Sequence, residues 1–485
     1  MTVEAHEASG NGVGRKESLY QTRQKVYPRR VRGPIRRVKW IVLAVCLTAY
    51  YVAPWLRWDR GLGRPDQAFL VDMPARRAYF LGLEIWPQEV YYIAGLLILG
   101  AIGLFFVTSL FGRIWCGFTC PQTVWTDLFM WAERLVEGDR MQRVRLDQQP
   151  WTFRKLGIKA AKHGIWLLIA AATGGAWIMY FNDAPTVTRN LLTLQASTTV
   201  YFFFGLFTAT TYLLAGWARE QVCTYMCPWP RFQSAMVDEE TLTVTYRGWR
   251  GEPRGRLHKG EDFEGRGDCV DCHACVAVCP TGVDIRDGLQ LECIGCGLCI
   301  DACDEIMDGV GRPRGLVAFD TALNRVAHER GASARPRLIR PRTIVYAAIM
   351  LMAAGTMSAT LLNRATASIT VLPERSPLFV RLSDGSIRNS YVIKIQNKEP
   401  AERSFVLSEE GLPFAMLHVA EGEAAPVPGG AGVIVTVRSD SVGTFHAYLH
   451  LEKTAQPETP FLFIARARDG GETVSYNATF RGPGR

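Results

Sequence analysis

The sequence contains no motif for a nucleotide cofactor. There is no Walker A sequence, and no GxGxxG stands where a strand would lead into a helix. The first 20 residues also lack the apolar core and the small-residue cleavage site of a secretory signal peptide. These absences argue against a flavin or nicotinamide site within this chain, and against a cleaved leader.

The charge balance is basic, and the arginines are unevenly spread. The chain has 485 residues with a formal net charge of +9, and 48% of its residues are hydrophobic. A chain of this length is expected to form more than one domain. A basic balance can reflect binding to nucleic acid or to a membrane surface. Because the arginines crowd the flanks of apolar runs, we favour the membrane and expect no nucleic-acid partner.

Five apolar runs are long enough to cross a bilayer, which takes about 20 residues. None of them has Asp, Glu or Arg at its centre. A buried helix of a soluble protein could imitate one such run, but five argue for a membrane bundle. The runs are approximately Val38–Leu56, Val90–Phe111, His163–Phe181, Thr198–Trp217 and Thr343–Leu362.

Lysine and arginine counts predict which side each loop faces, because basic loops stay in the cytoplasm. The stretch up to Lys39 carries ten such residues, Arg57–Glu89 five, Gly112–Lys162 nine, Asn182–Ser197 one and Ala218–Arg342 seventeen. The N-terminus, the second loop and the cysteine-rich segment are therefore predicted to be cytoplasmic. The C-terminal segment then lies on the opposite side of the membrane, since long domains are translocated regardless of charge.

Eight of the 13 cysteines lie between Cys269 and Cys303, in a pattern that occurs twice. Three cysteines at every third position are followed by a fourth, as in two-cluster bacterial ferredoxins. Pro280 follows the first copy, and Asp304 takes that place in the second. In such ferredoxins the fourth cysteine of each run binds the other cluster. We therefore predict two [4Fe–4S] clusters, the first held by Cys269, Cys272, Cys275 and Cys303 and the second by Cys279, Cys293, Cys296 and Cys299.

Two other uses of these cysteines fit the sequence less well. Structural zinc also takes four cysteines, but zinc sites rarely use this run twice. A disulfide framework fits poorly in a segment expected inside the cell.

A second cysteine motif, Cys-x-x-x-Cys-Pro (CxxxCP), also occurs twice. Cys116 and Cys120 recur as Cys223 and Cys227, at an offset of 107 for both cysteines (223 − 116 and 227 − 120). Each pair follows an even-numbered apolar run, which indicates a repeated helical hairpin with both motifs at the cytoplasmic face. Residues four apart share one face of a helix, so each pair could present two sulfurs together and the two pairs could form one site.

The chemistry of the CxxxCP pairs is open on the sequence alone. Thiolates suit Cu(I) or iron–sulfur chemistry, and Met226 offers a soft thioether beside Cys227. A redox dithiol, or buried cysteines acting as small hydrophobic residues, are the alternatives. Cys46, alone within the first apolar run, is interpreted as a core residue.

The segment from about Ala365 changes to short β-rich runs and contains no cysteine. Turn signals such as Asp384-Gly385 and Asp469-Gly470-Gly471 separate the runs, which is typical of a β-sandwich. We interpret it as a binding or docking module without chemistry of its own. The runs are Ile369–Leu372, Tyr391–Ile395, Ser404–Leu407, Gly432–Val437, Thr444–Leu451 and Phe461–Ala465.

These features together resemble the cytochrome c oxidase accessory proteins of the CcoG, FixG and RdxA type. The resemblance covers most of the chain. The cysteine motifs are shared with other membrane ferredoxins, including those of nitrate reductase systems, but their combination with Trp-rich segments and a β domain is more specific. The matching segments, besides the double ferredoxin motif, are Val52–Asp59, Glu84–Tyr91, Trp115–Asp127 and Cys223–Arg231.

The resemblance implies a role in assembling the cbb-type haem–copper oxidase, through reduction of Cu(II) to Cu(I). It also implies a multi-pass protein of a bacterial inner membrane, with the C-terminal domain in the periplasm. It implies that the eight ferredoxin cysteines bind clusters. It also makes Cys116, Cys120, Cys223 and Cys227 candidates for a catalytic copper-reducing site. The expected partners are membrane lipid, a separate cytoplasmic electron donor, and copper-delivery or oxidase-assembly proteins, with a homodimer left open. The alternatives are a ferredoxin that exchanges electrons with quinone or a respiratory partner, and a non-enzymatic assembly scaffold.

The predicted fold is multi-domain: an α-helical membrane bundle of about five helices, an inserted two-cluster ferredoxin-like domain and a C-terminal all-β immunoglobulin-like sandwich. The predicted boundaries are a basic N-terminal segment at 1–37, a four-helix membrane region with both CxxxCP hairpins at 38–231, the ferredoxin-like domain at 232–342, the fifth membrane helix at 343–362 and the sandwich at 363–485.

Overall fold

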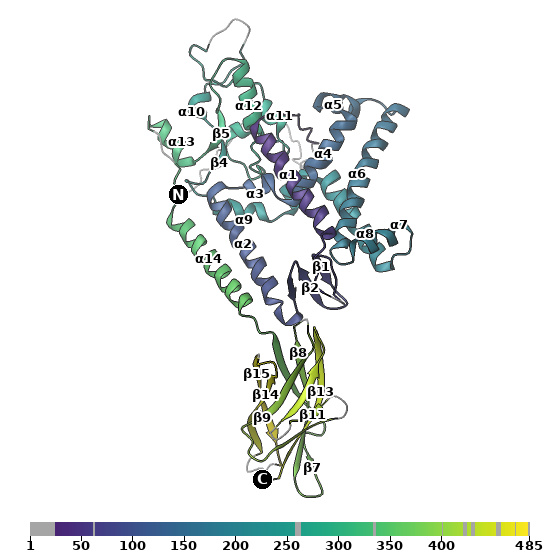
Figure 1. The fold of residues 1–485 in the computed structure, drawn as a ribbon. Helices are drawn as coiled ribbons and strands as arrows, with labels where there is room; N and C mark the ends of the chain where they lie inside the picture. The colour runs from purple at the N-terminus through teal and green to yellow at the C-terminus, as the bar shows by residue number, and fades with distance from the viewer. Residues whose placement is uncertain are drawn as a thin grey trace, which may run out of the picture. The chain divides into compact units, whose positions relative to one another are not determined.

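The structure is a computed structural model that describes residues 25–61, 64–257, 263–332, 336–399, 401–420, 424–427, 432–452, 457–470 and 472–483. Its contacts divide the chain into two compact units. One comprises Met1–Arg60 and Arg64–Ala354, and the other Gly61–Gly63 and Gly355–Arg485. Figure 1 shows the elements of both units in chain order.

The first unit consists of helices and two small antiparallel sheets. Its longer helices are α1 (Pro34–Val52), α2 (Tyr91–Phe111), α4 (Pro121–Glu137), α6 (Phe153–Met179), α8 (Thr198–Thr211) and α12 (Leu298–Gly309), and α14 (Pro341–Leu362) crosses the boundary between the units. The shorter helices are α3 (Ile114–Phe118), α5 (Arg140–Gln148), α7 (Ala184–Leu192), α9 (Trp229–Met236), α10 (Gly248–Gly251), α11 (Ala274–Val278) and α13 (Ala322–Glu329). The sheets are β1 (Phe69–Asp72), β2 (Arg77–Phe80) and β3 (Leu83–Ile85), and the pair β4 (Thr243–Tyr246) and β5 (Val317–Asp320).

Among the described residues, four helical segments are long and apolar enough to cross a membrane. They match four of the five predicted runs. The remaining run, His163–Phe181, lies largely within the continuous helix α6 but is not among the four. Lys162, His163 and the glycine pair Gly174-Gly175 make this stretch less apolar than the others. The number of crossings therefore stays a prediction. The four segments are Pro34–Trp55, Pro87–Phe111, Thr198–Ala218 and Pro341–Leu362.

The ferredoxin-like region packs directly on the helix bundle. Pro34 begins α1, a position where proline costs no backbone hydrogen bond. The backbone N–H groups of Ile35 and Arg36 donate to the carboxylate of Asp301 in α12, at 3.2 and 2.7 Å. A side chain from the cysteine-rich segment thus caps the first membrane helix, and Figure 1 shows α12 beside the start of α1.

Buried ion pairs also connect α4 to α1 and to α5. Asp127 of α4 lies 2.7 Å from Arg36 and 3.6 Å from Lys39, and all three side chains are buried. Burial alone would raise the pKa of Asp127, but Lys39 and Arg36 outweigh it and hold the pKa below its usual value. Glu133, two turns further along α4, pairs with Arg143 at 3.1 Å and Arg219 at 2.8 Å. The paired charges therefore stabilise the packing of α1, α4 and α5.

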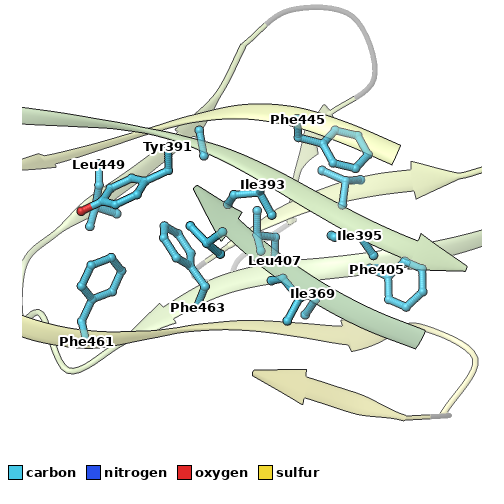
Figure 2. Packing of buried hydrophobic residues seen from close by; sticks show 14 of the residues in the cluster. Ile369, Tyr391, Ile393, Ile395, Phe405, Leu407, Phe445, Leu449, Phe461 and Phe463 are labelled. Atoms are coloured by element: carbon cyan, nitrogen blue, oxygen red, sulfur yellow. The ribbon is translucent and has the colours of Figure 1, made fainter. Parts of the chain in front are cut away.

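The second unit is a sandwich of two five-stranded antiparallel sheets. One has the order β10-β13-β8-β6, with β7 also pairing with β8, and the other the order β11-β12-β9-β14-β15. Alternate residues of β8 and β9 face inward, so Ile393, Ile395, Phe405 and Leu407 are fully buried in the core shown in Figure 2. The strands are β6 (Ala367–Pro373), β7 (Val380–Arg381), β8 (Ile387–Asn397), β9 (Arg403–Glu410), β10 (Met416–Val419), β11 (Ala424–Pro426), β12 (Val433–Val437), β13 (Ser441–Leu451), β14 (Glu458–Ala467) and β15 (Thr473–Arg481).

The predicted β runs fall within β6, β8, β9, β12, β13 and β14, apart from Gly432, which precedes β12. The predicted runs do not include β7, β10, β11 and β15, nor β1–β3 in the loop after α1, nor the pair β4 and β5. β15 reads Thr-Val-Ser-Tyr-Asn-Ala-Thr-Phe-Arg, and only Phe480 in it is buried. A mostly polar edge strand gives little alternation of apolar and polar residues to detect.

Candidate iron–sulfur and thiolate sites

The two ferredoxin loops have the same backbone shape at an offset of 24 residues (293 − 269). In the first loop Asp271 and His273 have φ angles of 49° and 55°, and in the second Gly295 and Gly297 have 67° and 69°. Glycine adopts this left-handed conformation without steric cost, and Asp and His are among the side chains that tolerate it. In the first loop Arg286 stabilises the left-handed residues. Its guanidinium lies 2.5 Å from the Asp271 carboxylate and 2.8 Å from the His273 ring nitrogen.

The first cysteine set gathers around one small cavity. Cys269, Cys272, Cys275 and Cys303 all line it, together with Tyr246 and Arg286. The pKa of Cys303 is raised to about 12, mainly by burial and to a smaller extent by the neighbouring Cys275, Cys272 and Cys269. The structure therefore brings the fourth cysteine of the second run to the first three cysteines of the first run, as the interleaved ligand assignment requires.

The second set contains no exposed cysteine, whereas Cys272 of the first set is exposed. Burial raises the pKa of Cys299 well above its usual value, and Cys296, Cys293 and Cys279 add to the effect. Cys279 of the first run thus lies near the three cysteines of the second. Cys275 also acts on Cys299, so the two sets are neighbours.

These sets fit iron–sulfur clusters better than single metal ions. Among the described residues, no three His, Cys, Asp or Glu side chains are close enough to hold one ion. A structural zinc site needs that compact arrangement, whereas a four-iron cubane is larger and keeps its thiolates further apart. Apolar side chains such as Ile300, Met307 and Leu316 surround the thiols, as a buried cluster requires.

The CxxxCP pairs do not lie on continuous helices, and this part of the sequence analysis was wrong. Cys116 lies in α3, but Cys120 is extended (φ −55°, ψ 129°) and precedes α4. Cys223 lies in a π-helical turn, and Cys227 is extended at its end. The reason is the proline after each second cysteine, which disfavours helical geometry for the residue before it.

The four CxxxCP cysteines nevertheless lie near one another, although no three of these described side chains are close enough to hold one ion. The pKa of Cys223 is raised to about 12, mainly by burial and to a smaller extent by Cys120, Cys116 and Cys227. Cys116 donates to the side-chain oxygen of Gln233 at 3.0 Å, which links the first motif to α9 after the second. Cys116 is buried and Cys227 exposed, so the group of thiols extends from the interior to the surface.

The first CxxxCP motif touches the second ferredoxin loop. A Cβ atom on Gly117 would lie 2.8 Å from the Cα atom of Cys296, so only glycine permits this approach. Cys116 belongs to the same buried cluster as Cys296 and Leu298, and Cys223, Trp229 and Cys299 pack against it. The CxxxCP thiols and the second cysteine set therefore share one apolar core.

Three residues that hold this region together were not singled out from the sequence. They are Asp301, which caps α1, Gln233, which bonds Cys116, and Arg113, whose guanidinium donates to the carbonyl of Leu291. Each acts on a segment far away in the chain, and local spacing carries no signal for such contacts.

Apolar helices of membrane length, two ferredoxin-type cysteine sets and a separate β-sandwich define a membrane iron–sulfur oxidoreductase. Residues 218–322 match a family described as "4Fe-4S dicluster domain", and residues 93–137 match one described as "4Fe-4S binding domain". Residues 357–483 match the "IG-like fold at C-terminal of FixG".

The chain belongs to the FixG/RdxA family. It is 47% identical to the nitrogen fixation protein FixG of Rhizobium meliloti, over 96% of this chain and 94% of that protein. It is 46% identical to RdxA and 48% identical to RdxB of Cereibacter sphaeroides, over 96% of this chain and 99% and 98% of theirs. A crystal structure of a FixG-related protein from Vibrio parahaemolyticus aligns with 24% of this chain and 96% of its own, at 18% identity and a TM-score of 0.20.

Proposed function

We propose that this protein reduces Cu(II) to Cu(I) at the CxxxCP thiolates, with electrons that arrive through the two clusters. The observation that carries the proposal is the contact of Gly117 with the Cys296 backbone. It brings a thiol group suited to copper against the ligands of the second cluster. The notion that the reduced copper serves assembly of a cbb-type oxidase is supported by family resemblance alone.

The clusters, when bound, supply one-electron exchange, so each reduced cluster can convert one Cu(II) to Cu(I). The chain itself provides the copper ligands. Because burial raises the pKa of Cys116 to about 11 and that of Cys223 to about 12, these thiols release their protons when they bind the metal. Soft thiolates stabilise Cu(I) relative to Cu(II), which favours the reduction.

The arrangement of the thiols supports a path for copper from the surface of the protein to the buried thiols. A cavity of about 180 Å³ is lined by Cys223, Met226, Cys227, Arg231 and Glu292 among other residues. Met226 is 63% exposed, so its thioether can contact an incoming ion before the buried thiols do. We expect copper to bind first at Cys227 and Met226 and to be reduced nearer Cys116.

A second candidate function is electron exchange with a membrane quinone, without copper. A largely apolar cavity of about 380 Å³ lies at the end of α2 and is lined by Phe111, Leu291, Cys293 and Phe319 among others. It would admit an aromatic ring next to a ligand of the second cluster. Reduction of the clusters by a short-chain quinol, with no oxidation by Cu(II), would favour this function.

The test is anaerobic stopped-flow oxidation of dithionite-reduced full-length protein by Cu(II). Cys116→Ser and Cys223→Ser should each slow cluster oxidation strongly. The double variant should lose little more than either single variant, because groups that act as a unit are not additive. Iron content should stay at the wild-type level, since eight other cysteines hold the clusters.

Another outcome would reject the copper site. If the single variants keep full Cu(II) reduction while their iron content falls, the CxxxCP cysteines hold an iron–sulfur cluster or serve structure. If no variant and no copper addition changes the redox state of the clusters, a non-enzymatic scaffold becomes the better account.

A further inference from the structure

Arg113 is a buried cation between the second ferredoxin loop and the CxxxCP thiols. It follows α2, and only 8% of its surface is exposed. One guanidinium nitrogen, Nη1, donates to the Leu291 carbonyl of the ferredoxin loop. Nε is buried and has no hydrogen-bond partner. The Arg113 backbone also packs on Gly295, where an added Cβ would lie 3.2 Å from the Arg113 carbonyl carbon.

Its charge has no carboxylate partner among the described residues, which sets it apart from the other buried arginines there. Arg36 pairs with Asp127, Arg143 and Arg219 pair with Glu133, Arg340 pairs with Asp238, and Arg403 pairs with Asp469. A buried charge is costly unless an opposite charge or good hydrogen bonds compensate it. The one hydrogen bond to the Leu291 carbonyl compensates this charge only in part, and negative charge on the groups that face Arg113 would compensate it further.

The facing groups are thiols from three separate segments. Arg113 lowers the pKa of Cys116 and of Cys293 against the larger, opposing effect of burial. It does the same for Cys223. Cys293 is a predicted ligand of the second cluster, whereas Cys116 and Cys223 belong to the proposed copper site. Iron-bound thiolates leave a cubane with net negative charge, and its reduction adds one more electron.

We propose that Arg113 is a positioning residue whose buried charge balances the second cluster and the adjoining CxxxCP thiolates, and so raises the reduction potential of that cluster. The inference rests on the proposed electron path from the second cluster to these thiolates. Net charge and hydrogen bonds near the sulfurs are among the factors that set the potential of such clusters. Arg113 acts on Cys293 of the second set, whereas Arg286 is the cation that acts on Cys275 of the first set, so we expect a smaller effect on the first cluster.

The experiment is an EPR-monitored redox titration of the full-length protein under anaerobic conditions, without copper. Arg113→Gln should shift the midpoint potential of the second cluster to a more negative value and move the first cluster less. Arg113→Lys keeps the charge and should stay near the wild-type potential. Arg340→Gln, at an equally buried arginine that Asp238 pairs, is the control and should leave both potentials in place.

The outcomes separate a charge effect from a structural one. If Arg113→Gln loses its clusters, retention of both clusters at wild-type potential in Arg113→Lys still supports the proposal. Equal shifts in the Lys and Gln variants, equal shifts of both clusters, or unchanged potentials in Arg113→Gln with full iron content would each overturn it. Because no copper is present, an unchanged potential leaves the copper proposal standing, and failure of copper reduction leaves the role of Arg113 standing.

Discussion

Cys272 and Cys296 belong to different cysteine sets, and Cys272 is exposed while Cys296 is buried. We expect about eight iron and eight sulfide ions per chain in anaerobically reconstituted protein, as two cubanes require. Cys272→Ser should remove the signal of the first cluster and weaken the other less, and Cys296→Ser should do the reverse. Iron, sulfide and EPR measurements check this, with Cys46→Ser as the control that keeps both clusters. Stoichiometric zinc without acid-labile sulfide would show that the ligand assignment is wrong.

Gly117 is the residue at which the CxxxCP motif and the ferredoxin loop meet most closely. Gly117→Ala places a methyl group 2.8 Å from a backbone atom of Cys296, so one of the two loops must shift. Overpacking of this kind costs about 1–3 kcal/mol. We expect a lower Tm and slower Cu(II) oxidation of the reduced clusters. Gly309→Ala in α12, where an added Cβ would meet nothing within 4 Å, is the matched control. Equal Tm values and equal rates of cluster oxidation in the two variants would mean that the contact affects neither stability nor electron transfer.

At the scale of single elements, α4 depends on its buried carboxylates. Asp127→Asn leaves Arg36 and Lys39 without their negative partner in a buried position. Breaking a buried pair in this way costs about 3–5 kcal/mol. The matched control is Asp308→Asn in α12, because Asp308 and its partner Arg314 are both exposed and such pairs contribute about 0–1 kcal/mol. Thermal unfolding of both variants in detergent checks the difference, and similar Tm values would contradict it.

The same carboxylates predict how stability varies with pH. Burial alone would raise the pKa values of Asp127 and Glu133, but their cationic partners outweigh it and lower both values. The unfolded chain has values of about 3.9 and 4.3. Stabilisation from a lowered pKa is therefore complete at neutral pH and is lost as the pH falls through and below those values. The wild-type Tm should fall on acidification. The Tm of Asp127→Asn should fall less over the same pH range, because one of the two titrating carboxylates is absent.

The elements differ in how far the sequence predicts them. The long apolar helices and the strands at the centre of each β-sheet follow from apolar runs, and the cysteine spacing placed Cys303 with the first set and Cys279 with the second. The four-residue spacing of each CxxxCP pair predicts two sulfurs on one helix face. The prolines at 121 and 228 fix an extended cysteine instead. The buried ions of α1 and α4 were missed because each partner looks like an ordinary surface charge until the helices pack.

At the scale of the whole chain, the proximity of the two CxxxCP motifs bears on the number of crossings. Cys116 follows α2 and Cys223 follows the Thr198–Ala218 segment, yet the two cysteines are neighbours. If both segments span the membrane, both must end on the same side. The chain from α2 to α8 must then cross once more. Between them α6 alone, among the described helices, is long enough: its 27 residues extend about 40 Å.

The packing of α6 explains why its composition differs from that of the other four segments. A Cβ atom on Gly174 would lie 2.9 Å from the backbone nitrogen of Thr208 in α8, so the two helices approach closely through a small residue. Small residues at such contacts are typical of helix pairs in membranes. A helix that packs on its neighbours in this way needs less apolar surface than one facing lipid on all sides.

Five crossings make a definite prediction for topology. A reporter fused after Gly260, which lies outside the described residues, should be cytoplasmic. A reporter fused after Leu194, in the exposed turn between α7 and α8, should be periplasmic, and so should one at the C-terminus. If α6 does not cross, the Leu194 reporter reads as cytoplasmic and the other two exchange sides, because the chain then crosses once fewer before α8. That result would mean that Cys116 and Cys223 lie on opposite sides of the membrane, which would rule out the proposed copper site.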